Sequence, residues 1–297
     1  MATFAKATFG HSTYAAFRPN YPTALYDAVL HYHQGPKKLC LDLGCGTGIA
    51  SRALSKRFDR VIGTDPSAGM ISQAQNANDS ADAKDKLSNL SFQQASGESS
   101  PFIKDGEVDC VTAAQAAHWF DYDKLWPELK RIVRPGGTMA FWGYKDHVFP
   151  DFPEASKILQ HYAYNEHPDK LGIYWPQPGR SYVQEKLHII RPPRADWQDV
   201  QRIEYEPGTN GPESGEGTLF MKRTVTVGEC KEYVRTWSSY HGWKEEHPGQ
   251  EARSKGGQGD IVDQMFDEIA QTDKHFKAEE NNVYIEWGSA LLMARRK

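Results

Sequence analysis

Three glycines at alternating positions form the strongest chemical signal in the sequence. Gly44, Gly46 and Gly48 lie in the segment 41–48 (LDLGCGTG), between an apolar run and a helical segment. Glycines there let the backbone turn sharply and let a ligand lie against bare main chain, while the next helix offers unpaired N–H groups. The spacing is GxGxG, and the bulky Ile49 that follows it disfavours a site for a dinucleotide pyrophosphate.

Two acidic residues flank this glycine loop along the chain. Asp42 stands on the apolar run just before the loop, where a carboxylate suits an ammonium partner better than a phosphate. Asp65 ends the next apolar run, where an acidic side chain can accept two hydrogen bonds from ribose hydroxyls. The pattern predicts a ligand that carries a ribose and an amino group.

A parallel sheet is needed to position these residues, and the first half of the chain predicts one. Short apolar runs alternate with helical segments, as in βαβ units. A breaker cluster at Pro135, Gly136 and Gly137 ends the last of these helices. We expect strands over 38–43, 60–64, 89–94, 108–113 and 138–144, and helices over 47–57, 67–77 and 122–133.

The second half has a different rhythm. Pro, Trp, Tyr and His are frequent over 150–180, and residues 207–218 form a turn-rich connection. Residues 227–243 predict one helix with Tyr233, Trp237 and Tyr240 at i, i+4 and i+7. We expect a further helix over 260–270 and strands over 200–206 and 283–294. The predicted division is an N-terminal helical arm (1–37), a Rossmann-like core (38–145), and substrate cap elements with the closing strands (146–297).

Composition limits the class of protein. The 297 residues are 39% hydrophobic and 25% charged, with a formal net charge of -4, which gives no overall attraction to nucleic acid or anionic lipid. The sequence shows neither a signal-peptide pattern nor an apolar stretch of about 20 residues. The four cysteines form no CxxC pair or zinc pattern. We predict a cytoplasmic, metal-free protein, monomeric or homodimeric, with no nucleic-acid or membrane partner.

The segment 41–48 and Asp65 resemble the first motif and the ribose-binding acid of class I methyltransferases. The segments 108–120 and 134–137 resemble their fourth strand with its exit loop and the turn before their fifth strand. The resemblance implies a doubly wound α/β fold with a mostly parallel seven-stranded sheet and a helical, aromatic-rich C-terminal cap. It also implies S-adenosylmethionine as cofactor and S-adenosylhomocysteine as product. The implied cofactor-binding residues are Tyr14, Arg18, Asp42, Gly44, Gly46, Gly48, Asp65, Ser67, Met70, Ser96, Gly97 and Gln115.

Several blocks of the second half are similar to fungal trans-aconitate and cantharidin-type methyltransferases. They comprise FWGY at 141–144, FPDFPE at 149–154, YW at 174–175, QPGRS at 177–181, and the segment 233–241. This resemblance implies a small carboxylic acid as acceptor and a methyl ester as product. Arginines suit the remote carboxylates of such an acid. The candidate substrate residues are Trp142, Tyr144, Trp175, Arg180, Arg235, Tyr240 and His241, with His118 as the candidate catalytic residue.

Other interpretations remain open from the sequence. The acceptor could be a phenol, thiol or amine of a secondary metabolite, which would need a base such as His118. The fold could also serve a non-catalytic regulator that binds the cofactor. A nucleic-acid or protein methyltransferase is disfavoured, because Ala114, Gln115, Ala116 and Ala117 stand where base-amine methylases carry Asn-Pro-Pro-Tyr/Phe.

Overall fold

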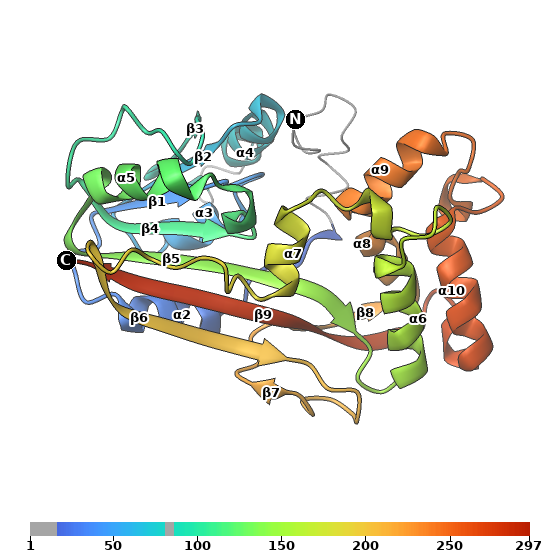
Figure 1. The fold of residues 1–297 in the computed structure, drawn as a ribbon. Coiled ribbons are helices and arrows are strands. Elements are labelled where there is room, and N and C mark those ends of the chain that lie inside the picture. Colours follow the sequence, from blue (N-terminus) through green and yellow to red (C-terminus); the bar gives the residue numbers. More distant parts are fainter. Residues whose placement is uncertain (1–16, 81–85) are drawn as a thin grey trace. The chain divides into compact units, whose positions relative to one another are not determined.

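The computed structural model describes residues 17–80 and 86–297 of the chain. They form two units, each assembled from separate stretches of sequence (Figure 1). The sheet unit comprises the described part of Asn20–Tyr144, with Ser181–Glu204 and Ser289–Lys297. The helical unit comprises residues 17–19, Lys145–Arg180 and Tyr205–Gly288. The chain therefore leaves the sheet unit after Tyr144 and returns to it twice.

Parallel strands form the centre of the sheet unit, as the alternation of apolar runs predicts. The hydrogen-bonded order is β3-β2-β1-β4-β5-β9-β6, and each pair among the first five strands is parallel. This confirms the doubly wound, mostly parallel α/β fold. The seven strands are β1 (Leu39–Leu43), β2 (Arg60–Asp65), β3 (Leu90–Gln94), β4 (Val108–Ala114), β5 (Val133–Val148), β6 (Trp197–Glu206) and β9 (Asn282–Arg296).

Two short strands extend the sheet beyond the seven expected. β7 (Glu216–Gly217) pairs with the end of β6, and β8 (Lys222–Thr226) pairs antiparallel with the start of β9. The predicted sheet is therefore two strands too small. The two-residue β7 lies inside the segment that the sequence marks as turns.

The strand order creates a switch point between β1 and β4. The chain winds from β1 outward through β2 to β3 and then returns to β4 on the other side of β1. Open α/β sheets bind ligands beyond the carboxyl ends of such strands. The glycine loop follows β1 and Gln115 follows β4, so both lie at this edge of the sheet unit.

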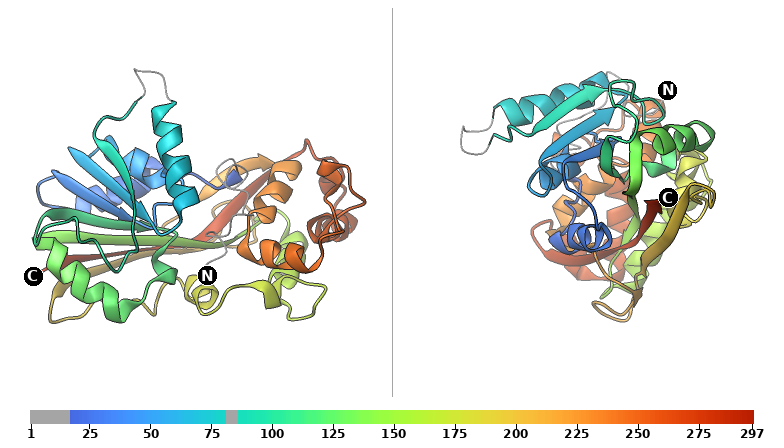
Figure 2. Two further views of the ribbon diagram at one scale, coloured as in Figure 1. Left: turned by 90° about the horizontal axis from the view of Figure 1, so that it is seen from above. Right: turned by 90° about the vertical axis from the view of Figure 1, so that its left-hand side faces the viewer.

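Helices cover both faces of the parallel strands. Figure 2 (left) shows α4 and α5 on opposite sides of the sheet. Strand side chains such as Leu41, Val111 and Phe141 are completely buried, which is typical of strands covered on both faces. The helices of this unit are α2 (Thr23–Tyr32), α3 (Ile49–Ser55), α4 (Ala68–Asp79), the 3-10 turn η2 (Ala117–Trp119) and α5 (Tyr122–Ile132).

The Pro-Gly-Gly cluster does more than end a helix. α5 ends at Ile132 and β5 begins directly at Val133, before the cluster, whereas the sequence predicts a strand only from residue 138. Val108 pairs with Val133 and Cys110 with Thr138, so the β4–β5 register shifts across the cluster. The breaker residues therefore form a bulge inside the strand.

The helical unit consists mainly of short helices beside the ends of long strands. β5, β6 and β9 contribute residues to both units. The short strands β7 and β8 also belong to it. Its helical elements are α6 (Pro153–Tyr164), η3 (Gly172–Tyr174), the start of α7 (Gly179–Gln184), α8 (Val227–Arg235), α9 (Ser238–Glu246), η4 (Arg253–Lys255), α10 (Ile261–Thr272) and η5 (Lys274–Lys277).

The predicted single helix over 227–243 is wrong. A capping box formed by Thr226 and Glu229 begins α8, which ends at Arg235, and α9 begins at Ser238. Between them Trp237 is extended (φ -69°, ψ 143°) and its indole is buried against the ring of Tyr233. Burial of this large ring outweighs the helical spacing, so the three aromatics do not share one helix face.

Hydrogen bonds tie down part of the turn-rich connection. The buried carboxylate of Glu286 accepts hydrogen bonds from the Tyr205 hydroxyl (2.6 Å) and the Glu213 amide (2.6 Å). The Tyr205 hydroxyl in turn accepts from the Gly215 amide (3.2 Å). One buried side chain on β9 therefore holds the middle of the segment 207–218.

Three further findings concern the described residues as a whole. None of their helices is long and apolar enough to cross a bilayer. They contain no cluster of three or more His, Cys, Asp or Glu side chains that could hold a metal ion. All four cysteines are free thiols and are buried.

Candidate functional site in the sheet unit

The glycine loop after β1 uses each of its three glycines, in different ways. Gly44, Gly46 and Gly48 have φ angles of +63°, +55° and +82°, a region that L side chains rarely adopt. A Cβ atom on Gly44 would lie 2.5 Å from that of Ala116, and one on Gly48 would lie 2.6 Å from the Phe92 ring. A Cβ on Gly46 would meet nothing within 4 Å. Two glycines therefore permit packing, and Gly46 leaves bare backbone beside open space.

Asp65 connects this loop to the next helix. Its carboxylate accepts hydrogen bonds from the amide of Gly46 (3.0 Å) and the amide of Ser67 (2.8 Å). The Cys45 amide also donates to the Thr64 carbonyl (2.8 Å), which fixes the loop against β2. The predicted ribose-binding acid thus lies directly beside the open backbone of Gly46.

Asp42 has a different position from the one its sequence context suggests. Its carboxylate is completely buried and accepts hydrogen bonds from the hydroxyls of Ser51 (2.6 Å) and Thr112 (2.8 Å). Burial raises the pKa of Asp42 to about 6. We therefore assign Asp42 to the support of the loop, because a buried carboxylate offers no surface for direct contact with an ammonium group.

The other predicted cofactor residues of this unit lie around α4 and the segment after β3. The Ser67 hydroxyl caps α4 by accepting from the Met70 amide (3.3 Å), and both residues are buried. Gly97 has no room for a side chain, since a Cβ there would lie 2.7 Å from the Phe120 ring. Ser96 is exposed. Ser67 and Met70 thus belong to the start of α4 and Gly97 to a packed turn, whereas Ser96 is at the surface.

Gln115 holds the carboxyl end of β4 to β5. Its backbone is left-handed (φ 53°), and its side-chain amide donates to the Tyr144 carbonyl (2.9 Å) and accepts from the Tyr144 amide (2.7 Å). Its own amide donates to the Trp142 carbonyl (2.8 Å). A left-handed non-glycine residue at a ligand-binding edge is a feature of functional sites. Hydrogen bonds therefore connect Gln115, predicted to contact the cofactor, with Tyr144, predicted to contact the substrate.

His118 and the aromatics of β5 lie in the same unit. His118 is half-buried in η2, with its ring centroid 4.8 Å from that of Trp119. Trp142 is buried and meets Tyr21 and Tyr26 edge-on at 5.6 and 6.0 Å, so it is a core residue. The ring of Tyr144 lies 6.3 Å from that of Tyr21. Tyr21 is not among the predicted site residues.

Candidate residues in the helical unit

Arg180 lies in a polar and aromatic cluster within the helical unit. Its guanidinium carbon is 3.9 Å from the centre of the Trp175 ring, and its Nη2 donates to the Asp146 carboxylate and the Tyr164 hydroxyl. Arg180 and Asp146 are both buried. The Nε atom of Arg180 is also buried and has no hydrogen-bond partner among the described residues. The cluster thus joins two predicted substrate residues to Asp146 and Tyr164, which the sequence analysis does not select.

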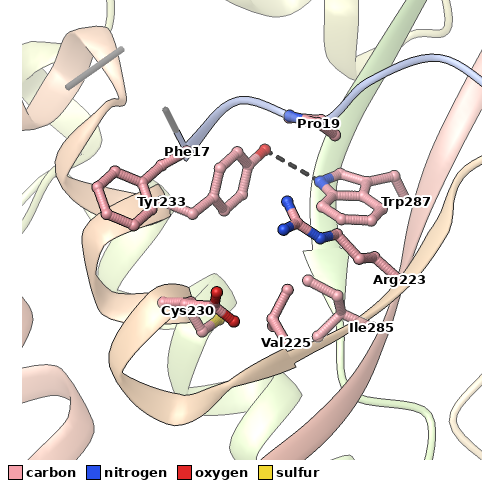
Figure 3. Close-up of a pocket in the computed structure, with 9 residues that line it drawn as sticks. Phe17, Pro19, Arg223, Val225, Cys230, Tyr233, Ile285 and Trp287 are labelled. Atoms are coloured by element: carbon pink, nitrogen blue, oxygen red, sulfur yellow. Dashed lines mark hydrogen bonds between the residues drawn. The ribbon is translucent and has the colours of Figure 1, made fainter. Parts of the chain in front are cut away.

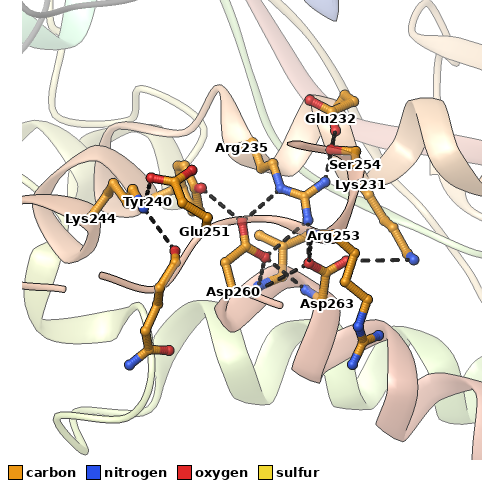
Figure 4. A network of polar contacts seen from close by, with 12 residues as sticks. Lys231, Glu232, Arg235, Tyr240, Lys244, Glu251, Arg253, Ser254, Asp260 and Asp263 are labelled. Carbon is orange, nitrogen blue, oxygen red and sulfur yellow. Dashed lines mark hydrogen bonds and ion pairs between the residues drawn. The ribbon is translucent and has the colours of Figure 1, made fainter. Parts of the chain in front are cut away.

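Arg235 and Tyr240 belong to an internal network (Figure 4). Arg235 donates through Nε and Nη2 to both oxygens of Asp260 (2.8 and 2.9 Å), and it also pairs with Asp263 (3.0 Å) and Glu232 (2.8 Å). The Tyr240 hydroxyl donates to Asp260 (2.8 Å). Asp260 itself caps α10. These contacts give Arg235 and Tyr240 a role in joining α8, α9 and α10, so we do not include them among the substrate-binding residues.

The remaining predicted residues have less specific surroundings. His241 is half-buried on α9, with its ring 6.0 Å from that of Tyr240. Arg18 donates to the Thr236 carbonyl (2.9 Å) and lies over the Tyr233 ring at 5.8 Å. Tyr14 lies outside the described residues. Arg18 therefore contacts residues of α8 and of the break after it, within the helical unit.

Similarity to known proteins

The fold and the glycine loop define a class I methyltransferase. The methyltransferase domain family matches residues 41–141, which extend from β1 to β5. A solved chain of Anaeromyxobacter dehalogenans, described as a type II methyltransferase, has a TM-score of 0.66 and covers 94% of this chain and 98% of its own. At 24% identity this likeness shows the fold alone.

Sequence relatives extend the assignment to the whole chain. A probable S-adenosylmethionine-dependent methyltransferase of Saccharomyces cerevisiae is 30% identical over 99% of this chain and 98% of its own length. A methyltransferase of Aspergillus candidus is 26% identical over 65% of this chain and 63% of its own. The chain therefore belongs to the S-adenosylmethionine-dependent methyltransferases, and S-adenosylmethionine is its cofactor. The open backbone at Gly46 beside Asp65 fits such a ligand.

Proposed function

We propose that this methyltransferase transfers the methyl group to a carboxylate of a small organic acid of the trans-aconitate type. S-adenosylmethionine supplies an electrophilic methyl group, so that a C–O bond forms as the C–S bond breaks, giving a methyl ester and S-adenosylhomocysteine. The similarity of the second half to trans-aconitate and cantharidin-type methyltransferases supports this substrate class. The protein would work in the cytoplasm on a small molecule, as a monomer or homodimer.

Residues of the sheet unit would hold the cofactor. Gly46 offers bare backbone, and Asp65 beside it would accept hydrogen bonds from ribose hydroxyls. Gly44 and Gly48 would maintain the loop through close packing. Asp42 would support it through its buried hydrogen bond with Ser51. Ser67, Met70, Ser96 and Gly97 complete this proposed site, and Gln115 fixes its far edge.

A carboxylate acceptor needs little chemistry from the protein. Carboxyl groups have reference pKa values near 4, so the acceptor is already ionised at neutral pH and needs no base. The protein must mainly align the attacking oxygen with the methyl group, an effect that can contribute on the order of 7–11 kcal/mol. Arginines can orient the acid through its remote carboxylates, where little charge changes during the transfer.

The geometry of Arg180 is the observation that carries this proposal. Trp175 packs against the guanidinium, and Asp146 and Tyr164 accept from its Nη2, so the group is held in place while its Nε remains as a donor. Its buried Nε has no partner among the described residues, and buried donors in proteins are nearly always paired. A carboxylate of the acceptor would satisfy this donor. Of the two arginines predicted for substrate, Arg180 alone keeps such a donor in the described part of the chain.

The test is methyl transfer from labelled S-adenosylmethionine to trans-aconitate, cis-aconitate, citrate, itaconate and isopropylmalate. Methyl esters release volatile labelled methanol in base, which distinguishes them from ethers and amines. We expect release from trans-aconitate well above the other acids. No release from any acid, with cofactor binding intact by calorimetry, would contradict the carboxyl assignment and favour a secondary-metabolite acceptor or a regulator.

Arg180 variants connect that assay to the structure. Arg180→Gln should raise KM for the acid by about tenfold or more, with a smaller change in kcat, because the contact is remote from the reacting oxygen. Arg180→Lys keeps the charge but has no donor in the position of Nε, so it should recover only part of the loss. An unchanged KM in Arg180→Gln would remove this residue from the substrate site.

A further inference from the structure

A cavity of about 50 Å³ lies in the helical unit, and each of its lining residues belongs to that unit (Figure 3). Its floor is one face of the β8–β9 pair. Arg223 and Val225 are two residues apart on β8, so their side chains leave the same face of the strand. Ile285 and Trp287 are likewise two apart on β9, and Ile285 is the register partner of Arg223.

The opposite wall comes from α8. Cys230 and Tyr233 are buried side chains of this helix, and Glu229 precedes them at its first turn. The Tyr233 hydroxyl accepts a hydrogen bond from the Trp287 indole (3.0 Å), which joins helix and strand across the cavity. Phe17 and Pro19 complete the lining. The walls are therefore mostly apolar and aromatic, and hydrogen bonding holds them in place.

Two opposite charges in this lining do not pair with each other. Figure 3 shows the Arg223 guanidinium turned into the cavity, and it makes no hydrogen bond or ion pair within the described part of the chain. The Glu229 carboxylate accepts one hydrogen bond, from the Thr226 amide (2.8 Å) in the capping box. It forms no ion pair with any described residue. Each charge can thus serve a ligand.

We propose that this cavity binds a small zwitterion, an α-amino acid with a short apolar side chain. The carboxylate would meet Arg223 and the ammonium would meet Glu229, with the Tyr233 and Trp287 rings adding attraction for the cation. Val225 and Ile285 would pack against the side chain. A cavity of about 50 Å³ holds only a few groups of the size of water, so the short side chain would enter it while the charged end of the ligand lies at its mouth, where Arg223 and Glu229 are exposed.

The lining carries one positive and one negative side chain, so a ligand with both charges fits it better than a ligand with one. A simple carboxylate would bring an uncompensated negative charge to the cavity that holds Glu229. A simple amine would bring its positive charge to Arg223. Binding of such a zwitterion involves residues of the helical unit alone, whichever acceptor the enzyme methylates.

Calorimetry on the full chain separates these cases with three probes of similar shape. L-valine carries both charges, N-acetyl-L-valine only the negative one and L-valinamide only the positive one. We expect valine to bind and each analogue to bind about tenfold more weakly or worse. N-acetyl-L-valine or L-valinamide binding as tightly as valine would overturn the proposal, as would no valine binding at about 10 mM.

Four variants locate the site. Arg223→Gln and Glu229→Gln should each weaken valine binding by about tenfold, and Gln preserves the capping box at position 229. Lys222→Gln is the matched control, because Lys222 directly precedes Arg223 on β8 and pairs with Glu213 instead. Val225→Trp should fill the cavity and abolish binding, with thermal unfolding checked separately. Valine affinity that survives in Arg223→Gln, Glu229→Gln and Val225→Trp would contradict the assignment.

Discussion

The two units use charged residues in contrasting ways. In the sheet unit, Asp65 bonds to backbone amides of the loop that it supports, and these contacts leave open space at Gly46. In the helical unit, Arg235 and Asp260 satisfy each other inside the fold. The first arrangement leaves backbone accessible to a ligand. In the second, the charged groups pair with each other and hold helices together.

This difference shows why a residue type alone is a poor guide to function. Arg180 and Arg235 have similar contexts in the sequence, each near aromatic residues of the second half. Arg235 has carboxylates on both sides of its guanidinium, while Arg180 has one carboxylate and a buried Nε without a described partner. Substitutions can distinguish charged groups that support the fold from those that bind a ligand.

Removal of the Arg235 side chain should have the largest effect. Arg235→Met leaves the buried Asp260 without its cation and Asp263 with only Lys231 (3.7 Å), which should lower the free energy of unfolding by about 3–5 kcal/mol in urea denaturation. Arg253→Met is the control, because its ion pair with Asp267 is exposed and should contribute at most about 1 kcal/mol. Equal stability of the two variants, with a raised KM in Arg235→Met, would make Arg235 a substrate residue instead.

The glycine loop offers a matched pair of alanine substitutions. Gly44→Ala combines a strained backbone with a clash against Ala116 and should cost about 2–4 kcal/mol of stability. Gly46→Ala meets no neighbour, so it should cost only about 1–2 kcal/mol while weakening cofactor binding by about tenfold. Calorimetric titration with S-adenosylmethionine distinguishes the two. Unchanged affinity in Gly46→Ala would show that the ligand does not lie against this backbone.

Substitution of Gln115 shows how much its side chain stabilises the contact between the ends of β4 and β5. Gln115→Ala loses both hydrogen bonds to Tyr144 and keeps the left-handed backbone, so we expect a loss of about 2 kcal/mol in thermal unfolding. Gln115→Gly loses the same bonds but relieves the backbone strain and should cost less. A larger loss in the glycine variant would contradict this account of the position.

Asp42 should give the smallest effect, visible in the pH dependence of stability. Burial raises the pKa of Asp42 to about 6, so the folded state holds this proton more tightly than the unfolded state does. Its contribution to stability therefore falls as pH rises from about 4 to about 6. Relative to Asp42→Asn, the wild type should lose about 1 kcal/mol between about pH 5 and about pH 7. A difference that is independent of pH would show that the buried group does not titrate in this range.

The sequence predicts the sheet unit well because its signals are local. Alternating apolar runs predict the parallel strands, and the glycine loop predicts which edge of the sheet carries the turn after β1. The bulge in β5 is missed, because Pro135, Gly136 and Gly137 also match a helix stop. The order of strand, loop and helix also brings Asp65 beside the Gly46 amide, although each signal is local.

The helical unit is harder to predict because its contacts join distant residues. Asp146 and Arg180 are far apart in sequence, as are Arg235 and Asp260. No sequence motif predicts either ion pair. The break between α8 and α9 depends on burial of Trp237, which helical spacing does not reveal. The polar partners that decide whether an arginine supports the fold or binds a ligand become visible only in three dimensions.

The pH dependence of methyl transfer to the preferred acid tests the central claim most directly. Imidazole has a reference pKa near 6.5, whereas a carboxylate acceptor is ionised well below neutral pH. We predict that kcat/KM stays flat from about pH 5.5 to about pH 8 and that His118→Gln keeps this flat profile. A sharp fall in the wild type below about pH 6.5 that His118→Gln removes would show that a base activates the acceptor, which contradicts an acceptor that is already ionised.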